Sequence, residues 1–147
     1  MRISNEFSVG LPVERAWVVL TDLARVAPCL PGAELTGVAG DTYTGTVSVR
    51  VGPVSALYTG TARFTELDAD ARRAVIDAAG RDRRNGTAAA TVTAALRPAG
   101  DRTAVSVATD LRLSGRLAQF GSGVVQQVAT GLLTEFVTRL EAMLGTA

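Results

Sequence analysis

The C-terminal segment from Ser114 to Leu144 constrains the fold of this chain more than any other feature. It is long, apolar and typical of a helix, and it follows a nearly unbroken series of segments that look like strands. Such a helix cannot bury its apolar side alone, so it must lie against the sheet that the preceding residues form. What lies between the helix and the sheet is then the question for function.

Most of the preceding chain alternates between apolar and polar residues with the period of two that half-buried strands have. A first strand is predicted over Arg2–Val9. Pro12 then stands where a first helical turn tolerates proline, and we expect short helices over Val13–Leu20 and Asp22–Ala27. The other predicted strands are Leu35–Val38, Asp41–Val51, Val54–Leu67, Ala74–Asp82, Gly86–Arg97 and Arg102–Leu113.

This order of elements predicts an α+β fold in which the helices are segregated from a mostly antiparallel sheet. The seven strands must curl around the long helix to cover it, with the two short helices after the first strand. That is the element order of the helix-grip fold, although order alone leaves other arrangements open. No repeat or linker interrupts residues 1–147, so we expect one domain.

Composition argues against several kinds of active site. The chain has no histidine, which is the commonest general base and metal ligand, and its single cysteine is Cys29. Ser122 therefore has no histidine to activate it as a nucleophile. We expect no catalytic residue, no metal site and no covalent cofactor.

Charge and hydropathy place the chain among soluble domains. The 15 basic and 14 acidic residues nearly cancel, which argues against nucleic-acid binding, and the Arg81–Arg84 run is most simply a solvated turn. The N-terminus has no apolar signal core, and no apolar run is long enough to span a bilayer. We expect a cytoplasmic protein.

The side chains predicted to face the helix are unusually small. Large ones occur only at Tyr43, Tyr58, Phe64 and Leu96, and aromatic residues make up 5% of the chain. Because protein interiors are close-packed, such a sheet either lets the helix come very close or leaves a hollow. Gly121, Gly123 and Gly131 of the helix favour a close approach, so the residues leave both interpretations open. The small inward residues are Gly45, Ala56, Gly60, Ala62, Ala88, Ala90 and Ala94.

Four aromatic residues have both a structural and a ligand-binding interpretation. Trp17 either packs in the core or stacks on a ligand, and Phe120 either packs in the core or gates an entrance beside the helix glycines. Tyr43 and Tyr58 each combine an apolar ring with a hydroxyl, which suits the orientation of a carbonyl or quinone oxygen. A structural tyrosine at a strand edge explains them equally well.

Three polar residues complete the candidates. Asn5 is in register with the inward residues of its strand and Thr109 with those of the last strand, so the two either supply hydrogen bonds to a pocket or satisfy each other. Asp77 lies on a strand whose facing is ambiguous.

Three segments resemble the carbon monoxide dehydrogenase G-subunit family, a branch of the START-like (SRPBCC) superfamily. They are Ala27–Leu35, with the sequence APCLPGAEL, the Val51–Val54 turn followed by Tyr58–Gly60, and Gly115–Gly121. The segments stand in the same order as in the family. The resemblance covers nearly the whole chain. The resemblance implies a helix-grip fold with an internal apolar cavity.

The resemblance also implies a function. It makes the chain a non-catalytic accessory protein of molybdenum-containing dehydrogenases of the carbon monoxide dehydrogenase type. The cavity would hold an isoprenoid quinone or a lipid, and the protein would make peripheral contact with the inner face of the membrane. The residues expected to contact the ligand are Trp17, Leu20, Tyr43, Val47, Tyr58, Phe64, Phe120, Val124 and Val128.

Two other functions remain open. A small polyketide aromatase/cyclase of the same superfamily would need several polar or ionisable groups inside the cavity, and the inward faces offer few. A ligand-free assembly factor would have a filled core.

Overall fold

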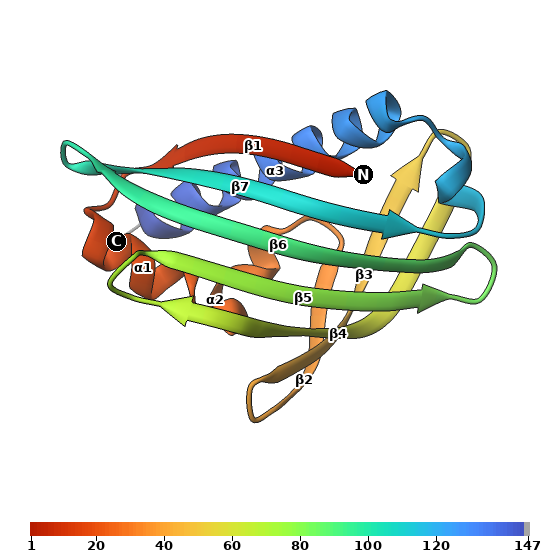
Figure 1. Ribbon diagram of the computed structural model, residues 1–147, viewed down its shortest axis with the longest axis horizontal. Helices are drawn as coiled ribbons and strands as arrows, with labels where there is room; N and C mark the ends of the chain where they lie inside the picture. The colour runs from red at the N-terminus through yellow and green to blue at the C-terminus, as the bar shows by residue number, and fades with distance from the viewer. Residues whose placement is uncertain (146–147) are drawn as a thin grey trace.

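The computed structural model, which describes residues 1–145, is a seven-stranded antiparallel sheet with a long C-terminal helix (Figure 1). The strand order is β1-β7-β6-β5-β4-β3-β2. The strands are β1 Arg2–Val9, β2 Ala33–Ala39, β3 Thr42–Val51, β4 Val54–Asp68, β5 Arg73–Asp82, β6 Gly86–Ala99 and β7 Arg102–Leu113. The helices are α1 Val13–Leu20, α2 Leu23–Val26 and α3 Ser122–Gly145, with 3₁₀ turns η1 Ala27–Cys29 and η2 Arg116–Gln119.

Helix α3 runs along the sheet on the side from which the inward residues project, and α1 and α2 lie near its C-terminal end (Figure 1). Strand β1 pairs with β7, so the first strand of the chain joins the last one. This arrangement confirms the predicted helix-grip fold, with its curved antiparallel sheet, long terminal helix and short helices after the first strand.

The long helix begins later than the sequence suggested. It was predicted from Ser114, but α3 starts at Ser122 and is preceded by the η2 turn. Gly115 has a φ of 85°, and Phe120 is extended with a ψ of 144°, so neither residue continues a helix. Leu117 in η2 is buried, so the segment that was expected to be helical supplies part of the core.

One half of the space under α3 is filled. The C-terminal half of α3 packs there through Leu140, which is fully buried, and Phe136, whose ring meets that of Phe7 edge-on at 6.3 Å. Trp17 of α1 is 9% exposed in the same cluster, so the structural interpretation of this residue is the one observed. The buried members of this cluster are Val9, Leu11, Ala16, Trp17, Val19, Val26, Cys29, Ala74, Leu96, Val105 and Leu140.

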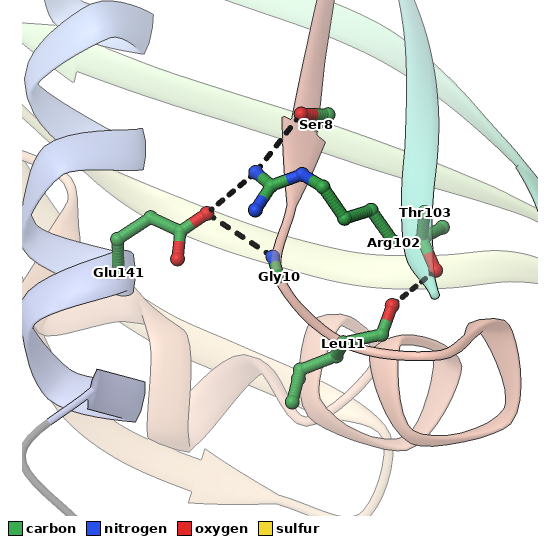
Figure 2. A network of polar contacts seen from close by, with 6 residues as sticks. All are labelled: Ser8, Gly10, Leu11, Arg102, Thr103 and Glu141. Carbon is green, nitrogen blue, oxygen red and sulfur yellow. Dashed lines mark hydrogen bonds and ion pairs between the residues drawn. The ribbon is translucent and has the colours of Figure 1, made fainter. Parts of the chain in front are cut away.

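In this filled half, a polar network connects α3 to the end of β1 and the start of β7 (Figure 2). The Glu141 carboxylate of α3 accepts from the backbone N–H of Gly10 at 3.2 Å and from the Arg102 guanidinium at 3.3 Å. Arg102 also donates to Ser8 at 3.1 Å. Beside it, the hydroxyl of Thr103 donates to the backbone carbonyl of Leu11 at 2.7 Å.

Replacing Thr103 by valine will destabilise the fold without changing its shape. Thr103 has no exposed surface, so the substitution leaves the Leu11 carbonyl unpaired in the interior. An unsatisfied buried group costs about 1–3 kcal/mol, and urea unfolding measures this loss. Thr93→Val, on a strand farther from this turn, is the control. An equal loss in both variants would contradict a specific role for the Thr103 hydroxyl.

Candidate ligand-binding cavity

The other half of the space under α3 is hollow. A cavity of about 340 Å³, partly open to solvent, lies between the N-terminal part of α3 and the concave face of the sheet. That volume falls near the lower end of the range of about 300–1,000 Å³ for small-molecule sites. Residues from every strand except β1 line it, together with Ala27 of η1, Leu117 of η2 and four residues of α3, which are Val125, Val128, Ala129 and Leu132.

The hollow exists because the residues in the middle of two neighbouring rows, each of which runs across the paired strands, have small side chains. Directly paired residues of antiparallel strands share a face. One row runs Leu35, Gly45, Gly60, Gly80, Ala88, Leu113, and the next runs Tyr43, Ala62, Ala78, Ala90, Leu111. The row after these is large, with Phe64, Ile76 and Val92, and there the filled half begins.

Glycine is required at two positions of these rows because neighbouring backbones come too close for a side chain. A Cβ on Gly60 would overlap the carbonyl oxygen of Ala79, and one on Gly45 would overlap the carbonyl oxygen of Glu34. Glycines at such positions mark bends and close approaches in sheets. Strand β4, which carries Gly60, bends strongly along its length (Figure 1). The same glycines therefore curve the sheet and leave the cavity without side chains.

Tyr58 supplies the one buried polar side chain of the cavity wall that has no partner within residues 1–145. It is 7% exposed and packs in a second cluster with Val51, Val54, Ala56 and Leu117. Its hydroxyl is buried and finds no hydrogen-bond partner among the described residues. Burial raises the pKa of the phenol above its usual value, and the negative charge of Asp82 adds to the rise.

The turn between β5 and β6 is held against β4, the strand that carries Tyr58. The Asp82 carboxylate accepts backbone N–H bonds from Leu57 at 2.6 Å, Arg84 at 2.8 Å and Asn85 at 3.2 Å. The side chain of Asn85 donates to the backbone carbonyl of Ser55 at 3.1 Å. These bonds to its carboxylate hold the pKa of Asp82 down to about 2. The Arg81–Arg84 run is thus a turn with a structural carboxylate rather than one that is merely solvated.

The stabilising effect of Asp82 will disappear in acid. Because its pKa is lower in the folded chain than the ordinary 3.8, its contribution is present above pH 4 and is lost as the pH falls from about 4 to about 2. Asp82→Asn will therefore be less stable than the wild type at pH 7, and most of this difference in stability will be lost by pH 2. Urea unfolding of both proteins across this range measures the difference. A difference that stays constant with pH would show that the charge of Asp82 is irrelevant.

The structure brings four of the nine predicted ligand contacts to the cavity wall. These are Tyr43, Val47, Tyr58 and Val128. Trp17, Leu20 and Phe64 belong to the filled half, and Phe120 packs against the cluster around Tyr58 without lining the cavity. Val124 is 42% exposed on the outer side of α3.

Several lining residues were not predicted, although their spacing carries a signal. On α3, Val125, Val128, Ala129 and Leu132 follow the spacing of one helical face, which excludes Val124. On β7, Leu111 and Leu113 continue the inward alternation of the strand. An entrance is predicted beside Gly121 and Gly123, but neither residue lines the cavity.

The polar candidates Asn5, Thr109 and Asp77 do not line the cavity. Asn5 does not pair with Thr109, but donates to the hydroxyl of Thr130 on α3 at 3.2 Å, outside the cavity. Asp77 points away from the helix side, where it accepts a hydrogen bond from Thr91 at 3.0 Å.

Gly123 and Gly131 of α3, and Gly121 just before it, do not bring the helix close to the sheet. A Cβ on Gly121, Gly123 or Gly131 would meet nothing within 4 Å. Of the two interpretations that the sequence left open, close approach at these glycines is therefore wrong, because the positions face open space.

Residues 1–145 contain no group of three or more acidic, cysteine or histidine side chains placed to hold a metal ion. Over the same residues, no helix combines the length and the apolar character needed to cross a bilayer.

Solved structures share this fold at low sequence identity. A conserved protein from Geobacillus kaustophilus superposes with a TM-score of 0.87 at 17% identity, over 99% of this chain and 96% of that one. A START superfamily protein from Mycobacterium smegmatis has a TM-score of 0.67 at 13% identity, over 99% and 97%. An aromatase/cyclase from Streptomyces sp. R1128 has a TM-score of 0.64 at 13% identity, over 97% and 92%.

The sequence itself matches a family. No curated protein matches the chain. The family model that describes the G subunit of carbon monoxide dehydrogenase (CoxG) matches residues 6–145, which is nearly the whole chain. With a START-like fold and a cavity between helix and sheet, this chain belongs to the carbon monoxide dehydrogenase G-subunit (CoxG) family.

Proposed function

We propose that this protein binds a hydrophobic ligand in the cavity under α3 and acts as a non-catalytic accessory protein. The cavity is the observation that carries the proposal. Its wall is built almost wholly from apolar side chains and backbone, so burial of apolar ligand area, at about 25 cal/mol per Å², supplies the driving force.

The same wall argues against an enzyme. Apart from the two tyrosines, the one ionisable side chain among the lining residues is Glu34, which is exposed and alternates with the inward-facing Ala33 and Leu35. General acid–base chemistry needs a positioned group of suitable pKa within hydrogen-bond reach of the substrate. The likeness to an aromatase/cyclase supports a shared fold and nothing further.

For the ligand we propose an isoprenoid quinone, and for the partner a molybdenum-containing dehydrogenase of the carbon monoxide dehydrogenase type. The family's name supports the partner. An almost wholly apolar cavity supports a ligand with few polar atoms, which a quinone is. The protein would collect the quinone in peripheral contact with the inner face of the membrane, and the quinone would carry the electrons.

Native mass spectrometry of the protein purified from its own host tests this function. We expect a bound apolar species that organic extraction releases and that has the absorption spectrum of a quinone. Dehydrogenase subunits should be recovered with the protein after mild crosslinking. A ligand-free protein from quinone-replete cells would contradict ligand binding. A bound lipid without quinone absorption would contradict only the quinone assignment.

A further inference from the structure

A second depression lies on the outer face of the sheet, which is the face of β3 and β4 turned away from α3. It is open to solvent, with a volume of about 630 Å³, between the outward side chains of these strands and the turn from β5 to β6. Arg50 pairs with Ser55 and Arg81 with Thr59, and directly paired residues share a face. We call it the basic depression, because its charged lining residues are Arg50, Arg81, Asp82, Arg83 and Arg84.

The positive charge of the basic depression is not compensated within residues 1–145. The ion pairs of these residues join other arginines to glutamates, and none involves the four arginines of the depression. The carboxylate of Asp82, the one acidic residue of the lining, accepts its hydrogen bonds from backbone N–H groups. Of the chain's 15 basic and 14 acidic residues, the depression takes four and one, and 11 and 13 remain elsewhere. A chain that is almost neutral therefore concentrates positive charge at one place, and the rest has a negative balance.

An exposed apolar side chain lies among these arginines. Leu57 is 51% exposed on β4, between the strands that carry Arg50 and Arg81. A single exposed leucine needs no explanation by itself. In the same depression as four arginines, however, it supplies the apolar centre and the polar surround of which protein interfaces consist, and arginine is enriched in such interfaces.

We propose that the basic depression docks an acidic segment of a partner protein, with carboxylates against its arginines and an apolar side chain against Leu57. The planar guanidinium group of arginine can bind a carboxylate through two parallel hydrogen bonds. The inference rests on the proposed function for the identity of the partner, the dehydrogenase. It adds the face and the chemistry by which that partner is held.

The position of Leu57 favours a protein segment over an anionic bilayer. An apolar group that anchors a protein to a membrane reaches about 5–10 Å into the boundary between headgroups and acyl chains. Leu57 comes from within a strand and lines a depression, rather than projecting from a loop, and a protein segment can enter that depression. The cavity lies on the opposite face of β3 and β4, so a partner docked here leaves the space under α3 free.

Charge reversal tests the proposal on the full chain. Arg50→Glu/Arg83→Glu is compared with Arg15→Glu/Arg25→Glu, which makes the same change in net charge on exposed positions of α1 and α2, at the other end of the molecule (Figure 1). The probe is a short peptide of glutamates with one central leucine, and fluorescence anisotropy gives its dissociation constant. We expect the first pair to weaken binding by about tenfold or more and the second pair to have little effect. Added salt should weaken binding to the wild type, because these charges are exposed to solvent.

A leucine exchange tests the apolar contact. Leu57→Thr should weaken the leucine-containing peptide by about fivefold and leave a peptide of glutamates alone unchanged. Leu67→Thr is the matched control, because Leu67 is 53% exposed at the far end of the same strand, and it should change neither peptide. None of these variants should unfold at a lower urea concentration than the wild type, which shows that they fold.

The crosslinking that tests the proposed partner is repeated with both charge-reversal pairs. We expect dehydrogenase subunits to be recovered with Arg15→Glu/Arg25→Glu and lost with Arg50→Glu/Arg83→Glu. If the subunits are recovered equally with both pairs, the partner stands and docking at the basic depression is overturned. If the wild type recovers no subunit, the proposed partner fails, and the peptides alone decide whether the depression binds an acidic segment.

The peptides can overturn the inference by themselves. Binding that both charge-reversal pairs weaken equally, or that neither weakens, would show that the basic depression is not the site. Vesicles of phosphatidylglycerol are the remaining probe, measured by co-sedimentation. If they bind the wild type through Arg50 and Arg83 while the peptide does not bind, the occupant is a bilayer and the inference is overturned.

Discussion

Replacing Ala90 by leucine will abolish ligand binding and leave the protein at least as stable as the wild type. Ala90 lies in the middle of a small row, and its side chain projects into the cavity. Leucine adds three carbon atoms there, each worth about 0.8 kcal/mol when buried, so the free energy of unfolding should rise by up to about 2 kcal/mol. The same atoms occupy the ligand's space, and the dissociation constant for menadione, a quinone without an isoprenoid chain, should rise more than about tenfold.

Ala95→Leu is the control for this result. Ala95 lies on the same strand but on the opposite, exposed face, and the residue change is identical. We expect unchanged menadione binding and a change in stability within about 0.5 kcal/mol. If Ala90→Leu instead destabilised the fold by about 1–3 kcal/mol, the cost of overpacking, then the space under α3 would be closed in solution.

Gly60→Ala will have the largest effect on stability. Its Cβ would overlap the carbonyl oxygen of Ala79 and crowd the backbone of Gly80, and neither is the flexible end of a side chain. Strands β4 and β5 must therefore separate where they pair. We expect a loss of about 3 kcal/mol or more in the free energy of unfolding, measured in urea.

Gly131→Ala should change stability in the opposite direction. Gly131 lies inside α3, and a Cβ there meets nothing within 4 Å. Alanine in a helix interior is more stable than glycine by about 0.5–1 kcal/mol. If Gly60→Ala proved as harmless as Gly131→Ala, the account of the sheet's curvature would be wrong.

The strands and their order could be predicted because a period of two has few alternative explanations. Arg2–Val9 and Arg102–Leu113 were predicted with the bounds that the structure has. The start of α3 could not be predicted, because residues 114–121 are apolar enough to continue a helix. Their departure from it depends on backbone angles at Gly115 and Phe120.

The cavity was only half predictable. The sequence shows that Gly45, Gly60 and Ala90 are small, but small residues fit a tight interface as well as a hollow one. The distance at which α3 sits decides between them, and that distance is set at the far end of the helix, by residues such as Leu140. Ala78 and Gly80 were missed because both faces of β5 carry apolar residues, so its facing stayed ambiguous.

The two halves under α3 also have an evolutionary consequence. Leu140, Trp17 and their neighbours hold the helix on the sheet without contributing to the cavity, while the face around Val125 and Leu132 lines the cavity and carries little of that packing. Substitutions at the cavity end therefore change what fits inside while the other end maintains folding. A scaffold divided in this way can acquire a new ligand by single steps, each of which leaves a folded protein for selection to act on.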